Sequence, residues 1–528
     1  MMKQLITNGR IYTLVDDLVV NSMVFDNGRI IAIGDNLENS SQFNKYKRIN
    51  CHGKVVLPGF VDAHTHFVFY ALSLGRIHLS DQDTLSVCLK KISKFAMSVR
   101  KNEWIVGAGF SPDRIFAIDE PNRFILDEVT GDHPTFIFSK DEHIAWANTK
   151  VLEIGGILNR KIYPTGGEII RLIDGTASGI LKEKPGYDPV YDKIPQPTKN
   201  YYDKFYKKAL QLAYSRGVTG VHSFDDPEAL KYMMDLTLKN RLGLRINYYP
   251  PPDLLPDLIQ SNSVYGTGNE FLRIAGIKIF ADGSLGSQTA LCFNKYSGSK
   301  DNNGMETLTS RRMRAIAKQA SKLGLPLAVH AIGDQAVANV LDALEKAPKL
   351  KTGGRHRIEH LQLIRPKDIK RLKELNIIAS MQPSHCPADI DLIQKYWGSR
   401  GKNAFIFNTL MNKGIDLAFG SDVPIEPLNP LHGIAAAVRR SRKGSRKSFY
   451  PDECITVLEA VKNFTIGPAI ASGQEKCRGR LFPGYPADFI ILSDDIFRVA
   501  PSRIYDIKVL ATFIGGNTVY NHNYIKIK

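Results

Sequence analysis

The sequence predicts an α/β protein whose core is a (β/α)8 TIM-type barrel, accompanied by a small β-sandwich domain formed by both termini. Two observations carry this prediction. Short apolar runs that end in polar residues alternate with helical patterns eight times along the middle of the chain, and both ends are rich in β-branched residues and turn signals. We place the sandwich at residues 1–57 and 475–528 and the barrel at 58–474. At 528 residues, 43% of them hydrophobic, the chain is long enough for one large core and a small one.

The first 57 residues read as short strands separated by turns. The runs "KQLITNGRIYT", "SMVFDNGRIIAIG" and "GKVVLPG" are β-rich, and Asn27-Gly28 between two apolar runs is a strong hairpin signal. The C-terminal residues have the same texture in "GRLFPGYPADFIILSDD" and "VLATFIGGNTVYN". The two ends are therefore predicted to form one sheet domain together.

Eight candidate barrel strands follow in order: "GFVDAHTHF", "GVTGVHSFDD", "GLRINYYPP", "GIKIFADGS", "LPLAVHAIGD", "HRIEHLQL", "IIASMQPSHC" and "DLAFGSDVP". Between them lie segments with apolar residues at helical spacing, such as 311–324 and 334–347. Residues 70–205 do not fit this alternation. We predict that they form an insertion after the first strand, with its own strands in "EWIVGAGF" and "PTFIFSKDEH", which makes a wall or lid over the site.

The run "GFVDAHTHF", residues 59–67, places two histidines one residue apart at the polar end of an apolar strand. Successive side chains of a strand point to opposite faces, so His64 and His66 face the same way, together with Asp62. Two imidazoles on one face are well placed to bind one metal ion.

Side chains at the C-terminal strand ends of such a barrel converge on one mouth. The polar residues at the predicted ends are His64, His66, His222, Lys278, His330, His360, His385 and Asp422. Nitrogen and carboxylate ligands in this number suit Zn²⁺ or a similar divalent ion. Each residue alone also fits an ordinary role, such as a hydrogen-bonded core histidine or a turn-capping aspartate, so the prediction rests on their convergence.

Lys278 differs from the other members of this set because it is a cation. Burial among metal ions would lower its pKa through desolvation and like-charge repulsion, and a neutral amine can react with CO₂. The resulting carbamate can bridge two metal ions about 3.5 to 4 Å apart. The alternative is that Lys278 pairs with Asp282 or with an anionic substrate.

The composition narrows the class of partner. The formal net charge is +17, but the densest basic run, residues 439–448, lacks interleaved aromatics, so we interpret it as a solvated loop or helix end and predict no nucleic-acid partner. The start of the chain lacks a signal-peptide pattern and no long apolar window occurs, which predicts a cytoplasmic protein without a membrane span. Six cysteines without CxxC spacing argue against a disulfide framework. A homodimer is the expected assembly.

Several stretches carry a family resemblance: "LPGFVDAHTHF", "KDEHIAWANTKVLE", "SGILKE", "GVTGVHSF", "IKIFADGSLGSQTA", "VHAIGDQAV", "RIEHLQL", "MQPSHCPADI", "FGSDVPIEPLNPLHGI" and "GRLFPGYPADFIIL". In these stretches, from about residue 50 to about 492, the chain resembles the metal-dependent amidohydrolase superfamily, in the branch of N-substituted formamide deformylase-like amidohydrolases. The resemblance implies the barrel, the composite sandwich and two divalent ions, zinc being expected. The chain departs from the pattern of this branch in "QPSHCPADI" and at Trp146, both near the expected substrate pocket.

The resemblance also implies a ligand for each metal. His64, His66 and Asp422 are expected on the more buried ion, His330 and His360 on the more exposed ion, and a carboxylated Lys278 between them.

On this basis we predict an enzyme that hydrolyses a carbon–nitrogen bond other than a peptide bond, in a small amide, formamide or N-acyl amine. A hydroxide that bridges the two metals attacks the carbonyl carbon, and Asp422 passes its proton to the departing nitrogen. His385 or His222 is expected to donate to the developing oxyanion.

Three further side chains complete the predicted site. His143, on the insertion, is expected to contact the substrate. Asp282 and Ser284, which follow Lys278 at the same strand end, are expected to orient metal ligands or substrate.

Two alternatives stay open at this point. A deaminase or cyclic-amidine hydrolase on the same barrel would more naturally use one metal and an unmodified Lys278. A non-catalytic barrel used for binding or assembly is disfavoured because every member of the ligand set is present.

Overall fold

The structure is a computed structural model that describes residues 3–16, 18–80, 82–115, 122–140, 144–159 and 167–522. It divides into two units, one formed by Met1–Phe69 with Ala209–Lys528 and the other by Tyr70–Lys208. None of the helices in these described ranges is both long and apolar enough to cross a membrane.

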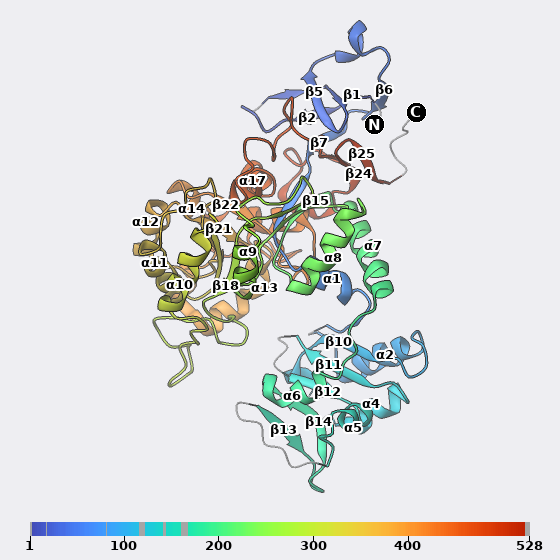
Figure 1. Cartoon of the computed structure of the whole chain (residues 1–528), viewed down its shortest axis with the longest axis vertical. Coiled ribbons are helices and arrows are strands. Elements are labelled where there is room, and N and C mark those ends of the chain that lie inside the picture. The colour runs from blue at the N-terminus through green and yellow to red at the C-terminus, as the bar shows by residue number, and fades with distance from the viewer. Residues whose placement is uncertain are drawn as a thin grey trace. The chain divides into compact units, whose positions relative to one another are not determined.

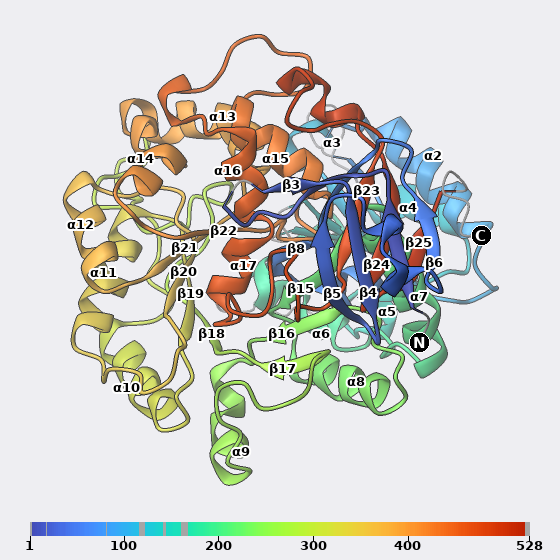
Figure 2. The same ribbon diagram turned by 90° about the horizontal axis from the view of Figure 1, so that it is seen from above.

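The first unit contains a closed ring of parallel strands (Figure 1, Figure 2). They are β8 (Phe60–Thr65), β15 (Val218–Ser223), β16 (Arg245–Tyr248), β17 (Leu272–Ile274), β18 (Ile277–Phe280), β19 (Leu327–Ala331), β20 (Arg357–His360), β21 (Ile378–Met381) and β22 (Leu417–Phe419). Their side chains are almost all buried, as expected for parallel strands covered on both faces. Each of the eight predicted barrel strands contains one of these elements, and the predicted TIM-barrel-type fold is confirmed.

Two local features close the ring. β17 and β18 follow one another beside β16, because Ala275 N donates to Tyr248 O and Lys278 N donates to Pro250 O, so the two pieces act as one interrupted strand. At the other seam, Thr65 pairs with Val423 in parallel, next to β22. The barrel therefore has eight strand positions, because β17 and β18 together occupy one of them.

Helices lie between the strands and cover them. They include α8 (Pro227–Leu238), α9 (Leu255–Gln260), α10 (Ser310–Ser321), α11 (Asp334–Glu345), α12 (Pro366–Glu374), α13 (His385–Leu392), α14 (Phe407–Asn412), α15 (Pro430–Arg439), α16 (Val457–Asn463) and α17 (Ile466–Ala471). Figure 2 shows α10, α11, α12 and α14 along the outer side of β18–β22. The two helical patterns predicted at 311–324 and 334–347 are confirmed as α10 and α11.

The basic run 439–448 begins at the last residue of α15, as predicted for a helix end, but one of its basic side chains is not solvated. Arg440 is buried, and its guanidinium donates to the carbonyls of Ala404, Phe405 and Phe449. A guanidinium carries five donors, so it can hold three loop carbonyls together where an apolar side chain would leave them without partners.

Two packed sheets lie beside the barrel, one formed by N-terminal strands alone and the other by strands from both ends of the chain. One sheet has the order β5 (Arg29–Gly34), β4 (Ser22–Asp26), β1 (Gln4–Thr7), β6 (Lys47–Asn50). The other has the order β25 (Asn517–Asn521), β24 (Val509–Ile514), β23 (Phe489–Leu492), β7 (Val55–Pro58), β2 (Arg10–Tyr12), β3 (Val19–Val20). Figure 1 shows the N-terminal and C-terminal strands side by side.

These two sheets share one hydrophobic core. Phe25 packs on Phe489 and Phe513, whose rings stack 4.2 Å apart between centroids, and Ile6 and Val56 belong to the same cluster. The hairpin predicted at Asn27-Gly28 is confirmed: β4 pairs with β5, and both turn residues have positive φ, as a type I′ turn requires.

The second unit is built on a mixed six-stranded sheet. Its order is β13 (Glu168–Arg171), β14 (Ala177–Lys182), β12 (Ile144–Ala147), β11 (Thr135–Ser139), β10 (Ile105–Phe110), β9 (Ile77–His78). Helices α2 (Leu85–Ala96) and α4 (Arg123–Thr130) belong to the same unit, and Leu126 shares a core with the buried Trp146. The strands predicted in "EWIVGAGF" and "PTFIFSKDEH" are present as β10 and β11. That this segment forms a wall or lid stays a prediction.

Candidate metal centre

Imidazole and carboxylate groups meet at the C-terminal ends of the barrel strands. His64 is the last residue but one of β8 and His66 directly follows that strand. His360 ends β20, His385 begins α13 after β21, and Asp422 lies in the loop after β22. They form two trios that share Asp422: His64, His66 and Asp422, and His360, His385 and Asp422. The ligand atoms of each trio lie within 4.8 Å of one another.

The carboxylate of Asp422 lies between the histidines, and each of its two oxygens faces imidazole nitrogens. Oδ1 is 3.3 Å from His64 Nε2 and 3.7 Å from His66 Nε2, and Oδ2 is 3.9 Å from His385 Nε2. A carboxylate can offer one oxygen to each of two neighbouring cations.

The loop that carries Asp422 is tied to the end of β8 by backbone and side-chain bonds. Asp422 N donates to His64 O at 2.8 Å, and the buried Asp62 accepts from His64 N at 3.1 Å and from Ser421 N at 2.9 Å through Oδ1. Gly420 permits this approach, because a Cβ atom there would lie 2.4 Å from His64 N. Asp62 thus fixes the two segments that carry ligands.

His360 and its neighbour Glu359 both face the barrel interior. Alternation along a strand would put them on opposite faces, but His360 has a φ of 69°, which breaks the alternation at the strand end. Glu359 Oε2 is 2.7 Å from His64 Nδ1 and is held in turn by the fully buried Arg357. This is the arrangement by which a carboxylate fixes the tautomer of a metal-binding imidazole and leaves its other nitrogen free for the ion.

Burial keeps the imidazoles neutral. It lowers the pKa of His66 to about 4 and that of His330 to about 3, with a further lowering from the charge of Lys278. The pKa values of His64 and His360 are lowered well below the usual range, again mainly by burial. Neutral imidazole is the form that binds metal.

Asp422 and Lys278 are both shifted toward their neutral forms. Burial raises the pKa of Asp422 to about 7, although the charge of Lys278 opposes the shift. Burial lowers the pKa of Lys278 to about 8, against the opposing charges of Glu359 and Asp422. The site therefore disfavours isolated charges and favours a state in which cations balance its carboxylates.

The polar atoms that lack partners fit a cation site. Among the described residues, His360 Nδ1, Lys278 Nζ and Asp62 Oδ2 are buried and have no hydrogen-bond partner. Lys278 Nζ instead lies over the rings of Phe224 and Phe280, 4.4 and 4.9 Å from their centroids. Buried polar atoms are rarely left without partners, so the neutral imidazoles, the carboxylate and this amine suit a site that holds metal ions.

His330, predicted as a ligand, lies beside the second trio. Its ring centroid is 4.5 Å from that of His360, and its Nε2 is 3.0 Å from the carbonyl oxygen of Gly283. The structure therefore brings His385, predicted as a catalytic donor, into the trio with His360, whereas His330 packs next to it.

His222 is placed deeper in the barrel than its predicted role requires. Its side chain is fully buried, and its Nδ1 is 2.6 Å from Arg357 Nη1. Since Arg357 also binds Glu359, His222 is connected to His64 through two intervening side chains.

Asp282 and Ser284 order the loops around the mouth. Asp282 accepts from the backbone N–H groups of Leu291, Ile332 and Gly333. Burial raises its pKa to about 7 against these bonds. Ser284 Oγ is 2.8 Å from Ser287 Oγ within the same loop. His143, predicted to contact the substrate, lies outside the described residues.

Sequence reasoning missed Glu359, Arg357 and Asp225. Asp225 accepts from the N–H groups of Val68 and Phe69 and so fixes the start of α1 (Phe67–Ser73), directly after His66. A signal was available in each case, since an arginine and a glutamate two residues apart inside an apolar strand, or an aspartate directly after one, must find a buried partner.

Comparison with known proteins gives consistent results. A model of the amidohydrolase family matches residues 47–520. The protein LONG AFTER FAR-RED 3 of Arabidopsis thaliana is 31% identical over 98% of this chain and 91% of its own length. The N-substituted formamide deformylase of Arthrobacter pascens is 25% identical over 94% of both chains. The crystal structure of an uncharacterized metal-dependent hydrolase from Pyrococcus furiosus matches with a TM-score of 0.78 and 29% identity, over 94% of this chain and all of that one.

Proposed function

Because the chain belongs to the amidohydrolase family, as its resemblance predicted, we propose that it hydrolyses a carbon–nitrogen bond, outside peptide bonds, in a small amide, formamide or N-acyl amine. One observation carries the proposal: the carboxylate of Asp422 is shared by two pairs of histidines at the strand ends of a barrel, His64 with His66 and His360 with His385. The similarity to an N-substituted formamide deformylase supports the type of bond.

The donor set suits two divalent ions, and zinc fits its imidazole and carboxylate ligands best. His64, His66 and Asp422 would hold one ion. His360 would hold the other with Asp422 and with His385 or His330, whose rings flank it. When bound, such ions lower the pKa of water toward 7 and polarise a carbonyl group.

Asp422 is the residue that moves the proton. Its carboxylate lies beside the imidazole nitrogens of both trios, so it is placed to accept a proton from a metal-activated water and to release it to the leaving nitrogen. Its Oδ2 faces His385, which supports the proposal that His385 contacts the substrate carbonyl as a donor.

Lys278 is proposed to be carboxylated. Its pKa of about 8 leaves part of the amine neutral at physiological pH, and the neutral amine adds to CO₂ with loss of one proton. The absence of a hydrogen-bond partner for Nζ among the described residues supports this modification. A carbamate would replace an unpaired cation by an anionic ligand between the two trios.

The remaining predicted residues are proposed to act at a distance from the reacting atoms. Asp282 holds the loops after β18 and β19 through three backbone bonds, and Ser284 orders its own loop. His222 acts through Arg357 and Glu359 on the orientation of His64. These are positioning roles.

The test uses the full chain, stripped of metal with a chelator and then reconstituted with Zn²⁺ in the presence of ¹³C-bicarbonate. We expect amine release from members of a panel of N-formyl and N-acyl amines only after metal is returned, and a carbamate ¹³C resonance that disappears in Lys278→Ala.

Amine release by the metal-free protein would contradict the proposal. Ammonia release from amidines or amino-heterocycles, without turnover of any acyl amine, would favour the deaminase alternative instead. Metal uptake without turnover of either class would favour the binding protein.

A further inference from the structure

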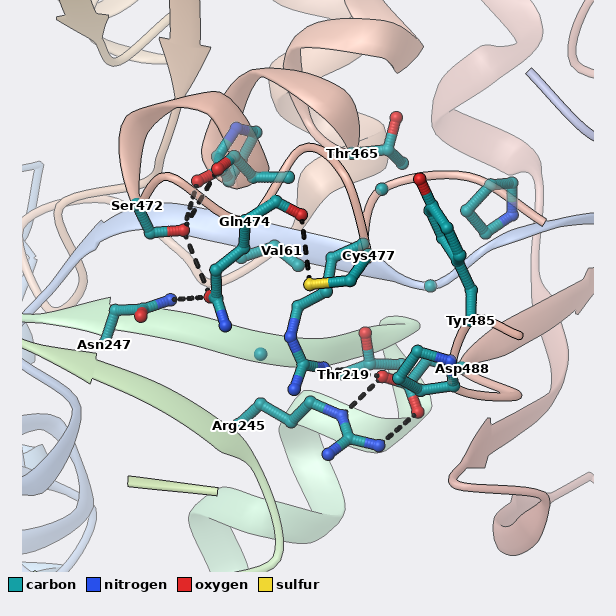
Figure 3. Close-up of a pocket in the computed structure, with 18 of the residues that line it drawn as sticks. Val61, Thr219, Arg245, Asn247, Thr465, Ser472, Gln474, Cys477, Tyr485 and Asp488 are labelled. Atoms are coloured by element: carbon teal, nitrogen blue, oxygen red, sulfur yellow. Dashed lines mark hydrogen bonds and ion pairs between the residues drawn. The ribbon is translucent and has the colours of Figure 1, made fainter. Parts of the chain in front are cut away.

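A second polar site lies at the opposite ends of the barrel strands. A cavity with about 40 Å³ of interior space is lined by residues at the starts of β8, β15 and β16 and by the segment 465–488 (Figure 3). Since a water molecule needs roughly 10 to 15 Å³ of such space, the cavity has room for about three waters or one small polyatomic ion.

Guanidinium groups outnumber carboxylates around this cavity. Four arginines line it, Arg245, Arg273, Arg478 and Arg480, against two acids, Glu270 and Asp488. Both acids are already engaged. Asp488 receives two bonds from Arg245 and lies 3.5 Å from Arg478 Nη1, and Glu270 lies 3.6 Å from Arg245 and also pairs with Arg29. Figure 3 shows the paired bonds between Arg245 and Asp488.

Arg273 lacks a balancing charge. It has no carboxylate within ion-pair distance among the described residues, and its buried Nε atom has no hydrogen-bond partner there. Its guanidinium lies 5.3 Å from the ring centroid of Tyr265, which packs against the charge but does not neutralise it.

Gln474 is oriented by two of the guanidinium groups. As drawn, its oxygen accepts from Asn247 Nδ2 and Ser472 Oγ, both at 3.2 Å, and its nitrogen faces the arginines. Exchanging the amide O and N satisfies all neighbours, because the oxygen then accepts from Arg273 Nη1 at 3.0 Å and from Arg478 Nε at 3.1 Å, while the nitrogen faces Asn247 and Ser472. Figure 3 shows Gln474 beside both of these polar residues. A neutral oxygen is thus the partner shared by two cations.

His222 contributes a buried donor to the same cavity. It lines the cavity and is fully buried, and its Nδ1 faces Arg357, so the proton is on Nε2. Nε2 makes no hydrogen bond of normal geometry among the described residues, but the Pro468 carbonyl lies close enough to favour the protonated ring. A buried N–H whose acceptor is poorly placed can still donate to a further group in the cavity.

The electrostatics agree with the geometry. Burial and the charge of Arg245 lower the pKa of Arg478 below its usual value, so neighbouring guanidinium groups destabilise one another here. Guanidinium forks match the oxygens of tetrahedral oxyanions through paired hydrogen bonds.

We propose that this cavity binds a small oxyanion of the phosphate class, held between Arg273 and Arg478 with Asn247 and His222 as neutral donors. The anion would join the N-terminal ends of the barrel strands to the segment 465–488. It would be separate from the metal centre, which lies at the other ends of the strands.

The test measures binding of inorganic phosphate to the metal-loaded full chain by calorimetry and by its midpoint of thermal denaturation, with chloride at equal ionic strength as the reference. We expect the midpoint to rise with phosphate concentration. In Arg273→Gln and in Arg478→Gln the dissociation constant should weaken at least tenfold, whereas Arg311→Gln, an exposed arginine of α10, should leave it unchanged.

The chloride reference separates binding from folding. Because Arg273 has no ion-pair partner among the described residues, Arg273→Gln should not lower the midpoint of thermal denaturation in chloride. Arg478→Gln keeps the test valid if Arg273→Gln fails to fold. Glycerol phosphate is titrated in parallel: binding equal to that of phosphate would indicate that the phosphoryl group of a larger metabolite is the natural occupant.

Three results would overturn the proposal. These are phosphate binding unaltered in both variants, phosphate binding that disappears when the metals are removed, and acetate bound more tightly than phosphate. The second would place the anion at the metal centre.

Discussion

At the carboxyl ends of its strands the barrel gathers neutral imidazoles around a shared carboxylate, whereas at the amino ends it gathers guanidinium groups around a cavity. At both ends buried polar atoms lack partners among the described residues: His360 Nδ1 at the mouth and Arg273 Nε at the base. The mouth offers lone pairs and the base offers N–H groups. One barrel thus carries two sites of opposite electrostatic character.

The two ends are joined by a line of buried side chains. His64 contacts Glu359, Glu359 binds Arg357, and Arg357 contacts His222, which lines the cavity at the base. A parallel barrel interior is usually filled with branched apolar residues. Here polar and charged groups that bind one another run through the interior. A substitution of one of them is therefore expected to affect the side chain that it contacts.

The largest effect is expected at the residue that both trios share. Asp422→Asn should lower kcat at least 10³-fold on the best acyl amine substrate, because it removes the group that moves the proton. Asp301→Asn, a highly exposed aspartate of the same unit, should change kcat less than twofold. Steady-state assays of both proteins at matched zinc content test this, and survival of activity within a few-fold in Asp422→Asn would remove its proposed role.

The next effect concerns the support of His64. Glu359→Gln should weaken zinc binding about 10- to 100-fold, since the carboxylate that orients the imidazole is lost while the ligands stay. Competition with a chelating dye measures the dissociation constant, with the exposed Glu374→Gln as the matched control. An unchanged zinc affinity would mean that the line through Arg357 does not influence the mouth.

Zinc binding below pH 7 should also depend on pH, mainly through Asp422. Below pH 7 the raised pKa of Asp422 keeps it protonated in the metal-free protein, so zinc must displace that proton. His66 and His330, with pKa values of about 4 and about 3, are already neutral above pH 5. Affinity should therefore rise about tenfold per pH unit from pH 5 to 7, and more slowly above pH 7, where Lys278 with its pKa of about 8 loses its charge.

The same shift has a defined sign for stability without metal. The folded-state pKa of Asp422 lies above its usual value, so its ionisation favours the unfolded chain. The free energy of unfolding of the metal-free protein therefore falls as the pH rises from about 4 to about 7. Chelator competition measures the pH dependence of zinc affinity, and calorimetry of zinc binding in two buffers measures the protons that zinc displaces. A release of two or more protons with a midpoint near pH 6.5 would point to the histidines instead.

The smallest effect is expected at the base. Gln474→Glu places a carboxylate where the amide oxygen meets Arg273 and Arg478, and charge-assisted bonds should raise the midpoint of thermal denaturation by about 1 to 2 °C without phosphate. The same variant should abolish the phosphate effect. A lower midpoint in chloride would show that the cavity does not need a negative charge.

Much of the fold follows from sequence because its signals are local. An apolar run that ends in a polar residue marks a barrel strand, and the run length and the following helical pattern repeat eight times. The strand-end rule also selects His64, His66, His360, His385 and Asp422, which the structure brings together. These residues share a position relative to their own strands, and the barrel converts that position into proximity.

Other features have no local signal. Alternation places Glu359 and His360 on opposite faces, and only the positive φ of His360 brings both inward. The choice of His385 over His330 as neighbour of Asp422 depends on where α13 begins. The cavity at the base combines Arg273 from β17 with Arg478, more than 200 residues later, so no spacing in the sequence announces it.

The pairing of β7 with β23 sets the order in which the molecule can be completed. Pro58 lies opposite Phe489, so a strand made early during synthesis has to wait for about 430 further residues before its neighbour exists. Until then its edge is open to pairing with other chains. On the ribosome the barrel can close before the sheet that pairs β7 with β23 does. Chaperone dependence or aggregation during expression should therefore respond to changes in this edge more than to changes at the mouth.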